Sequence, residues 1–180
     1  MKNTEILDVG CGHVVGHHKR GFIGIDLRRG KADIIGDVNY LPIRNNAFGK
    51  VLCYYLIEHV IDIPRVIGEL IRVAEREIEI VTDNALFYRI YLLRFLYLLK
   101  LVKEPGYINV EHVHAFYPSH LKHLLQRIRI KARVIPCNVG RLHKMDRIML
   151  ALTKICPQLK SFAERDIMIR ILKESAESES

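Results

Sequence analysis

Three carboxylates and a pair of glycines form the first chemical pattern in this sequence. Short apolar runs lead to Asp8, Asp26 and Asp37, and Gly10 and Gly12 follow the first run. Glycine has no Cβ and accepts unusual dihedral angles, so its backbone amides can approach a ligand closely. If the runs are parallel strands, an acid after the second strand can accept hydrogen bonds from the hydroxyls of a ribose. The pattern therefore predicts a nucleoside-binding site.

Histidines supply a second candidate chemistry. His59, His112 and His114 are candidates for moving a proton, because histidine side chains titrate near about pH 6.5. The alternative for His59 is a structural hydrogen bond to a neighbouring loop. Together, His112, His114, His120 and His123 suggest a metal site, but no carboxylate or cysteine completes a recognisable ligand set, so we predict no metal.

The elements that must position these residues alternate along the chain. Runs rich in β-branched residues recur at 6–9, 22–25, 32–35, 51–55, 77–82, 131–136 and 166–172. Helical spacing of apolar residues occurs at 63–74, 85–102, 118–127 and 141–155. Asp62 ahead of Pro64 is typical of a helix start. This alternation predicts an α/β fold with a doubly wound, mainly parallel sheet covered by helices on both faces.

Composition limits the class of protein. The chain has 180 residues, 49% of them hydrophobic, and a formal net charge of +8. A chain of about 150 residues buries roughly 70% of its unfolded surface, which favours one folded domain over disorder. We expect residues 1–173 to form this domain and residues 174–180 to be a frayed, disordered tail.

Three features that the sequence lacks indicate the cellular compartment. The N-terminus lacks the pattern of a signal peptide, and three cations interrupt the apolar stretch 85–102, so we expect no membrane span. The four cysteines form no C-x-x-C pair, which argues against a zinc ribbon or a disulfide framework. We therefore expect a cytoplasmic protein.

Residues 4–82 resemble the class I S-adenosylmethionine-dependent methyltransferases, especially the methyltransferase type 11 group. The resemblance rests on the segments ILDVGCG, FIGIDL, DVNYLPIRNNAFGKVLCYYLIEHV, IPRVIGELIRV and EIEIVT, and later on HVHAFYP at 112–118. It implies a Rossmann-like, seven-stranded, mostly parallel sheet that is closed by an antiparallel strand pair. It also implies the cofactor S-adenosylmethionine.

The resemblance assigns a role to each matching residue. The cofactor-binding residues that it implies are Asp8, Gly10, Cys11, Gly12, Asp26, Leu27, Asp37, Val38, Cys53 and Tyr54. The glycine loop, oriented by Asp8, would frame the methionine part, and Asp26 would hold the ribose. Asp37, Val38 and Leu27 would contact the adenine, while Cys53 and Tyr54 would border the methionine and the sulfonium.

Two departures from the family pattern affect the loops. Val14 stands where a third glycine is usual, which leaves Gly16 as an alternative and suggests a more open loop. Gly49 follows Phe48 where the family often has an acid. Neither change removes a residue that the cofactor chemistry requires.

Methyl transfer from a sulfonium is an in-line displacement, so the protein mainly aligns the acceptor and the methyl group. A base is needed only if the accepting atom holds a proton. The resemblance places the loop with His112 and His114 over the substrate pocket. We therefore expect these two residues or His59 to be catalytic.

The second half of the chain has a different character. Residues 1–83 hold 11 Lys or Arg and 12 Asp or Glu, whereas residues 84–180 hold 17 and 8. The segment 84–130 is expected to form the acceptor side, with an insertion and a lid. The apolar helix expected at 85–102 has four interpretations: part of the core, the face of a homodimer, a lid over an apolar acceptor, or a helix lying in lipid headgroups.

These observations predict transfer of a methyl group to a small or lipid-like acceptor with anionic character. One alternative is an RNA or protein methyltransferase that uses the basic half, although no RNA-binding motif supports RNA. A second alternative is a noncatalytic cofactor-binding subunit whose interface is the helix at 85–102. The acceptor itself is not specified by the sequence.

Overall fold

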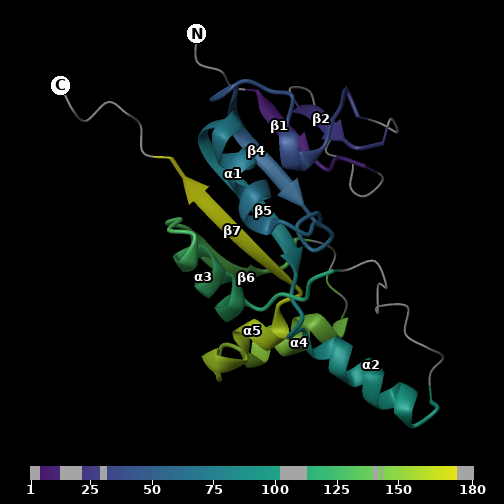
Figure 1. Cartoon of the computed structure of the whole chain (residues 1–180). Coiled ribbons are helices and arrows are strands. Elements are labelled where there is room, and N and C mark those ends of the chain that lie inside the picture. Colours follow the sequence, from purple (N-terminus) through teal and green to yellow (C-terminus); the bar gives the residue numbers. More distant parts are fainter. Residues whose placement is uncertain are drawn as a thin grey trace.

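The computed structural model describes residues 5–12, 22–28, 32–101, 113–139, 142 and 144–173. Its strands form a seven-stranded sheet with the order β3-β2-β1-β4-β5-β7-β6 (Figure 1). The strands are β1 (Ile6–Val9), β2 (Phe22–Asp26), β3 (Ile34–Ile35), β4 (Phe48–Tyr54), β5 (Ala74–Asp83), β6 (Arg133–Cys137) and β7 (Asp166–Leu172).

The pairing is parallel through the first five strands and antiparallel at β7. β1 lies between β2 and β4, and β5 pairs with β4, all in parallel. β7 runs antiparallel to both β5 and β6 and lies between them. The carboxyl ends of β1, β2, β4 and β5 therefore share one edge, and the predicted sheet with its antiparallel closing pair is confirmed.

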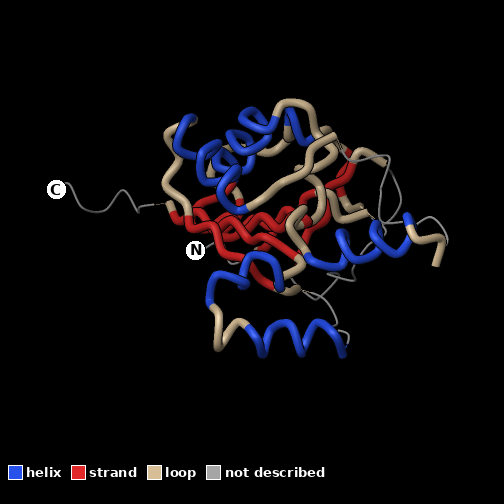
Figure 2. Tube along the Cα trace, turned by 90° about the horizontal axis from the view of Figure 1, so that it is seen from below, coloured by secondary structure: helices blue, strands red, loops and turns tan. Residues whose placement is uncertain are grey.

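The helices are α1 (Ile63–Val73), α2 (Tyr88–Leu98), α3 (Pro118–Arg127), α4 (Lys144–Leu152) and α5 (Lys160–Ala163), with 3-10 turns η1 (Val38–Tyr40) and η2 (Pro157–Leu159). Figure 1 shows α1 and α3 beside the sheet, while α2, α4 and α5 gather beyond the carboxyl end of β5. Figure 2 shows the strands with helices on either side of them.

Helix α1 illustrates how the sequence sets a boundary. The side chain of Asp62 accepts a hydrogen bond from the backbone N–H of Arg65 at 3.1 Å, and Pro64 occupies the first turn. Both features stabilise a helix N-terminus, as the sequence predicted. Val66, Ile67 and other residues at helical spacing face the sheet and are fully buried. Helix α1 therefore covers the middle of the sheet, behind the carboxyl edge.

The end of α1 is fastened by the last described residue of the chain. The helix passes directly into β5 at Ala74. The Lys173 ammonium, which follows β7, donates to the carbonyl oxygens of Ile71 at 3.1 Å and Ala74 at 2.8 Å. The connection between α1 and β5 is therefore tied to the C-terminal strand.

Helix α3 completes the core on the other half of the sheet. Leu121 and Leu125 are buried in the same hydrophobic cluster as Leu70 of α1 and Ile169 of β7. Burial of each such side chain contributes on the order of 2 kcal/mol. The prediction of a helix at 118–127 is confirmed in its full extent.

Two predicted helices are shorter than the sequence suggested. The apolar segment 85–102 is helical only at Tyr88–Leu98, because Asn84 holds the preceding residues in a turn by accepting from the N–H of Leu86 at 3.1 Å. Lys100 then takes a left-handed φ of 56° just after the helix. The helix predicted at 141–155 spans Lys144–Leu152.

Candidate functional site

A cavity of about 410 Å³ lies at the carboxyl edge of β1 and β2. Its walls come from four segments, namely the ends of these two strands, the loop 36–41 and the turn 56–62. Pockets of about 300 to 1,000 Å³ are typical of small-molecule sites. The cavity therefore lies where open parallel sheets bind their ligands.

The glycine turn after β1 forms one wall of the cavity. Gly10 has a φ of +77°, and a Cβ there would lie 3.0 Å from Cδ2 of Leu56. Its N–H donates to the carbonyl oxygen of Ile25 at 2.8 Å, which ties the turn to β2. A side chain at Gly12 would contact Oδ2 of Asp26 at 3.2 Å. These positions thus require glycine for the turn to approach β2 this closely.

Asp26 is the best-oriented acid of the site. Its Oδ2 accepts from the N–H of Gly12 at 3.0 Å, and its Oδ1 accepts from the N–H of Arg28 at 2.9 Å. Each oxygen of an ionised carboxylate has a further lone pair for another donor. Asp26 lines the cavity beside Leu27, whose side chain is 70% exposed. The carboxylate can therefore accept hydrogen bonds from two adjacent hydroxyls of a ligand.

The third wall is the loop that contains Asp37. The side chain of Asp37 caps η1, since its Oδ1 accepts from the backbone N–H and from the amide nitrogen of Asn39, each at 2.8 Å. Asp37, Val38 and Asn39 all line the cavity. The loop passes close to β2, because a Cβ at Gly36 would lie 2.8 Å from Cδ1 of Ile25.

Two of the predicted residues are buried in the glycine turn or directly before it. Asp8 and Cys11 are 7% and 8% exposed and do not line the cavity. The Cys11 thiol packs against Gly24 of β2, where a Cβ would lie 2.7 Å from its sulfur. Burial, followed by the nearby charge of Asp8, raises the pKa of Cys11 to about 11. The thiol is therefore a packing group at neutral pH.

Two further predicted residues, Cys53 and Tyr54, lie within β4 and away from the cavity lining. Cys53 is fully buried in the hydrophobic core, and burial raises the pKa of its thiol far above the ordinary value. The Tyr54 hydroxyl donates to Glu79 of β5. Glu79 also accepts from Lys50 at 2.9 Å and from Arg170 at 3.2 Å. Tyr54 thus belongs to a polar network on the sheet.

The wall near β4 comes instead from the turn that follows the strand. Tyr55 has a φ of 53°, and the chain then places Leu56, His59 and Val60 against the cavity. Side chains in a strand alternate between the two faces of the sheet, and neither Cys53 nor Tyr54 lines the cavity from β4. The missed signal is the left-handed turn, which the sequence FGKVLCYYLIEHV does not reveal.

The candidate histidines occupy different places. His59 lines the cavity in the turn ahead of α1, and its backbone N–H donates to the carbonyl oxygen of Leu56 at 2.9 Å. The His114 ring stacks on Phe116 with 5.7 Å between centroids, outside the cavity lining. His112 lies outside the described residues, as do Val14 and Gly16.

Two of the histidines considered as metal ligands lie on α3. His120 and His123 are exposed on this helix. Within the described ranges, no group of three or more His, Cys, Asp or Glu side chains is arranged to hold a metal ion.

Glu58 is a buried acid next to His59 in the turn after β4. It is 1% exposed, and its Oε2 accepts from the Thr82 hydroxyl at 3.0 Å. Its Oε1 has no hydrogen-bond partner among the described residues. Burial raises the pKa of Glu58 to about 7, and nearby Asp83 also raises it. Its backbone oxygen accepts from His114 at 3.1 Å, which joins the turn after β4 to the later loop.

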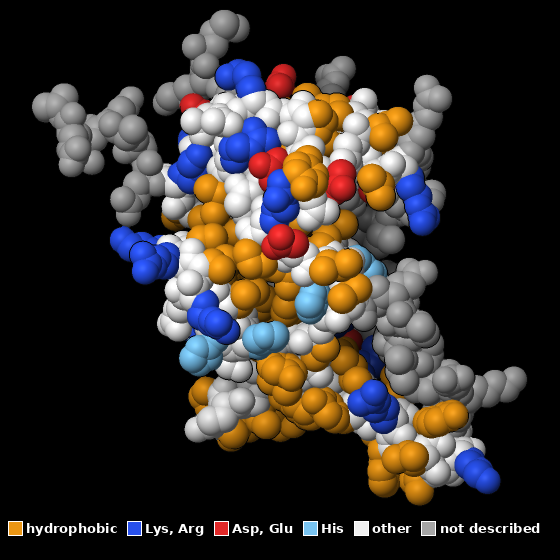
Figure 3. All heavy atoms as spheres, viewed as in Figure 1, with side chains coloured by type: hydrophobic (Ala, Val, Ile, Leu, Met, Phe, Trp, Pro, Cys, Tyr) orange, Lys and Arg blue, Asp and Glu red, His pale blue; other side chains and the backbone are white. Residues whose placement is uncertain are grey.

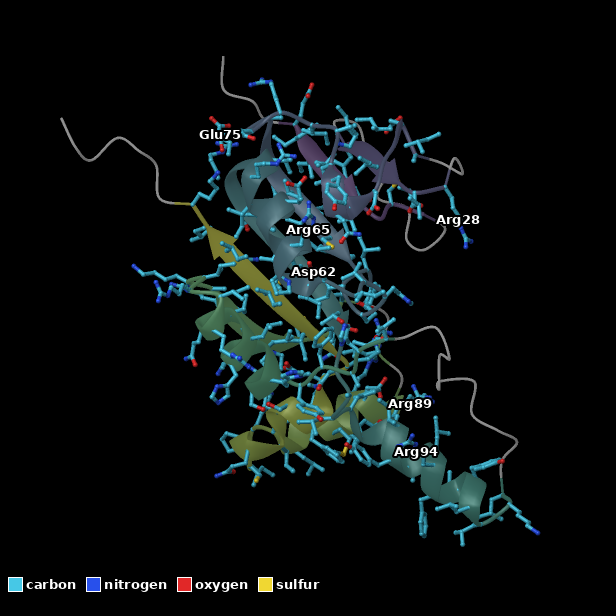
Figure 4. The ribbon with its side chains drawn as sticks, in the orientation of Figure 1. Arg28, Asp62, Arg65, Glu75, Arg89 and Arg94 are labelled. Atoms are coloured by element: carbon cyan, nitrogen blue, oxygen red, sulfur yellow. The ribbon has the colours of Figure 1, made fainter. Side chains whose placement is uncertain are left out.

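Figure 4 shows how the site borders α1. Asp62 and Arg65 lie at the start of this helix, and Arg28 projects from the end of β2. The guanidinium of Arg65 lies 3.9 Å from the centre of the Tyr40 ring, which packs the loop 36–41 against the helix. The cavity thus lies next to the capped start of α1 and next to the loop 36–41, which the cation–π contact holds against this helix.

Comparison with known proteins gives similarity of structure without similarity of sequence. No family model and no curated protein sequence matches the chain. Among solved structures, an S-adenosylmethionine-dependent methyltransferase from Archaeoglobus fulgidus has 18% identity and a TM-score of 0.57, over 96% of this chain and 87% of that one. One from Aquifex aeolicus has 13% identity and a TM-score of 0.52, over 94% and 84%.

A third methyltransferase of this kind, from Mesorhizobium loti, has 13% identity and a TM-score of 0.51, over 94% of this chain and 90% of that one. At identities this low the similarity shows a shared fold. It does not identify the methyl acceptor, because one fold serves many acceptors. The strand order β3-β2-β1-β4-β5-β7-β6 is the order of the class I methyltransferase fold. The chain therefore has the Rossmann-like fold of the class I S-adenosylmethionine-dependent methyltransferases.

Proposed function

We propose that the protein is an S-adenosylmethionine-dependent methyltransferase. The observation that carries the proposal is the Asp26 carboxylate, which two backbone amides orient on the wall of a cavity of about 410 Å³. An acid at the end of the second strand, beside a glycine turn, suits the two hydroxyls of a ribose. The fold of the solved neighbours supports the same cofactor.

The residues around the cavity fit the parts of this cofactor. In the proposal Asp26 binds the ribose, Gly10 and Gly12 approach the methionine part, and Leu27 and the loop with Asp37 and Val38 contact the adenine. Two pairs of residues, Asp8 with Cys11 and Cys53 with Tyr54, do not line the cavity and support the segments that do. Asp8 and Cys11 support the glycine turn, and Cys53 and Tyr54 hold the strand that leads to the turn after β4.

The bound cofactor supplies a methyl group on a positively charged sulfur. The acceptor's lone pair forms the new bond to carbon, and the carbon–sulfur electron pair stays with sulfur. The chain has to align the acceptor and exclude water, which lowers the barrier through proximity and orientation. His59, which lines the cavity, takes the proton if the accepting atom carries one. His112 and His114 are the alternative bases in the proposal.

The acceptor in this proposal is a small or lipid-like molecule with anionic character. The excess of Lys and Arg after residue 83 supports an anionic partner, since such charges raise the local concentration of anions. RNA or protein as the acceptor, and a noncatalytic cofactor-binding subunit, are the rival functions. A radiolabelled methyl-transfer assay on extracts separated into RNA, protein, lipid and small molecules distinguishes them by the labelled fraction.

Calorimetry with S-adenosylmethionine and its demethylated product tests the cofactor site directly. We expect Asp26→Asn to weaken binding by roughly 10- to 100-fold, the range for hydrogen bonds to a charged group. Glu75→Gln is the matched control, because it removes an exposed carboxylate far from the cavity (Figure 4). A folded wild-type protein that binds neither compound would contradict the proposal.

A further inference from the structure

One end of the molecule exposes large apolar side chains on two neighbouring helices. We call it the apolar-basic end and define it by α2 with residues 99–101 and by α4 with residues 153–160. Its exposed large apolar residues are Tyr91, Leu92, Phe95, Tyr97, Leu98, Leu99, Leu101, Met145, Ile148, Leu152 and Ile155. Figure 3 shows hydrophobic side chains gathered at this lower end, with Lys and Arg among them.

The contacts that tie α2 to other described residues lie near its N-terminus. The Tyr88 hydroxyl donates to Oδ1 of Asp146 on α4 at 2.8 Å, and the Tyr91 ring stacks on Phe162 with 5.8 Å between centroids. Beyond these contacts the helix projects from the body of the protein (Figure 1). Leu98 at its far end is 77% exposed. A helix this short is marginal in water without a packing partner, so the projecting half needs a surface to cover it.

The exposed side of α2 is continuous. At about 100° per residue, Tyr91, Leu92, Phe95 and Leu98 fall within an arc of roughly 120°. Tyr97 is also exposed, at 45%, on another side of the helix, and the remaining apolar residues of α2 are at most partly exposed. Arg94 stands beside the exposed arc, farther out along the helix than Arg89 (Figure 4). The exposed arc, with Arg94 at its edge, thus lies on a helix that is apolar on most of its sides.

The charge of the apolar-basic end has one sign. Residues 85–101 contain three cations and no acid. Residues 144–163 contain four cations and a single acid, Asp146, which is 4% exposed and hydrogen-bonded to Tyr88. The cations are Arg89, Arg94, Lys100, Lys144, Arg147, Lys154 and Lys160. The exposed charge on this end is therefore entirely positive.

This combination selects the occupant. A second copy of the chain would bring two sets of like charges together, which costs free energy at a contact. An anionic bilayer instead offers phosphates to the cations and hydrocarbon to the apolar side chains between them, because long cationic side chains reach outward from a buried stem. Among the described helices, none is long and apolar enough to cross a membrane. The charge and the exposed apolar side chains together favour the surface of an anionic membrane as the occupant.

We propose that the apolar-basic end binds the surface of membranes that contain anionic phospholipids, with α2 lying among the headgroups. This surface is separate from the cavity that holds Asp26. Membrane binding therefore does not depend on the methyltransferase proposal, and it places the protein where a lipid-like acceptor would be found.

Vesicle flotation of the full chain tests the inference. We expect the protein to float with vesicles of phosphatidylcholine mixed with phosphatidylglycerol, to stay behind with phosphatidylcholine alone, and to be released by high salt. Phe95→Asp combined with Leu98→Asp should reduce binding at least tenfold, because two anchoring side chains are lost. Leu172→Asp is the control, since Leu172 is also exposed, at 61%, but lies on β7.

A charge variant isolates the electrostatic contribution to vesicle binding. Arg94→Gln should weaken vesicle binding about fivefold, the effect of one cation near an anionic surface. Lys131→Gln, an exposed cation elsewhere, should leave it unchanged. Equal binding to neutral and anionic vesicles, or wild-type binding by the double variant, would overturn the proposal. The proposal would also be overturned if the wild-type protein forms a dimer and does not bind vesicles, and the double variant abolishes that dimer.

Discussion

The two halves of the molecule differ in their charge and in the exposure of their apolar side chains. The half around the cavity is nearly neutral, its helix α1 is capped and buried along one side, and its loops are tied by specific hydrogen bonds. The end built from α2 and α4 is basic, and many of its large apolar side chains are exposed. In our proposals, the first region binds the cofactor and the second associates with a membrane surface.

Truncating a leucine in each region gives the sharpest test of this contrast. Leu70→Ala on α1 should lower the free energy of unfolding by about 2 to 5 kcal/mol, because the side chain is fully buried. Leu98→Ala on α2 should change it by less than about 0.5 kcal/mol. Urea unfolding monitored by circular dichroism measures both. Similar losses for the two variants would mean that α2 packs on the body as α1 does.

Glu58 makes the stability of the cavity half depend on pH. Its pKa rises from 4.5 to about 7 on folding, so the folded state binds the proton more tightly than the unfolded state. The stabilisation by this group is therefore complete below pH 4.5 and is lost as pH rises to about 7, by on the order of 3 kcal/mol.

Glu58→Gln should remove this loss and flatten the pH profile of urea unfolding between pH 4.5 and 7. The exposed Glu75→Gln provides the matched control and should keep the wild-type slope. A profile unchanged by Glu58→Gln would show that Glu58 is ionised in the folded protein.

Tyr88 joins the projecting helix to the rest of the molecule. Tyr88→Phe removes the donor to the buried carboxylate of Asp146, and we expect a loss of about 2 kcal/mol. Amide hydrogen exchange should also accelerate along α2 while the amides of α1 keep their protection. If exchange in α2 stays the same, the helix has another anchor.

The cap of α1 should have the smallest effect. Asp62→Ala removes the hydrogen bond to the N–H of Arg65 and should destabilise the protein by about 1 kcal/mol. Asp62→Asn keeps a capping oxygen and should restore most of that loss in thermal unfolding. Equal destabilisation by both variants would show that charge, and not the cap, stabilises the helix start.

Much of the fold could be read from the sequence because its strands are short and strongly apolar. The runs at 6–9 and 166–172 coincide with β1 and β7 in full. Gly10 and Asp26 were selected because a strand end, a glycine and an acid coincide in the sequence, and both line the cavity. Local pattern and tertiary position agree at these residues.

Other parts of the site depended on geometry that residue types do not encode. Cys53 was assigned to the cofactor from its place near the end of β4, but the chain reaches the cavity only after the left-handed turn at Tyr55. The buried environment of Glu58 depends on Thr82, which is distant in the sequence and donates to one of its carboxylate oxygens. Such features arise when separate segments pack, so no local pattern predicts them.

The place of β7 has a consequence for synthesis on the ribosome. This strand comes last in the described chain, yet it inserts between β5 and β6 and carries Lys173 to the junction of α1 and β5. The parallel half of the sheet can assemble while the chain is still emerging, but one side of β5 then remains an unpaired apolar edge. Until the final strand is translated, the nascent protein exposes a template for misassembly that chaperones would have to shield.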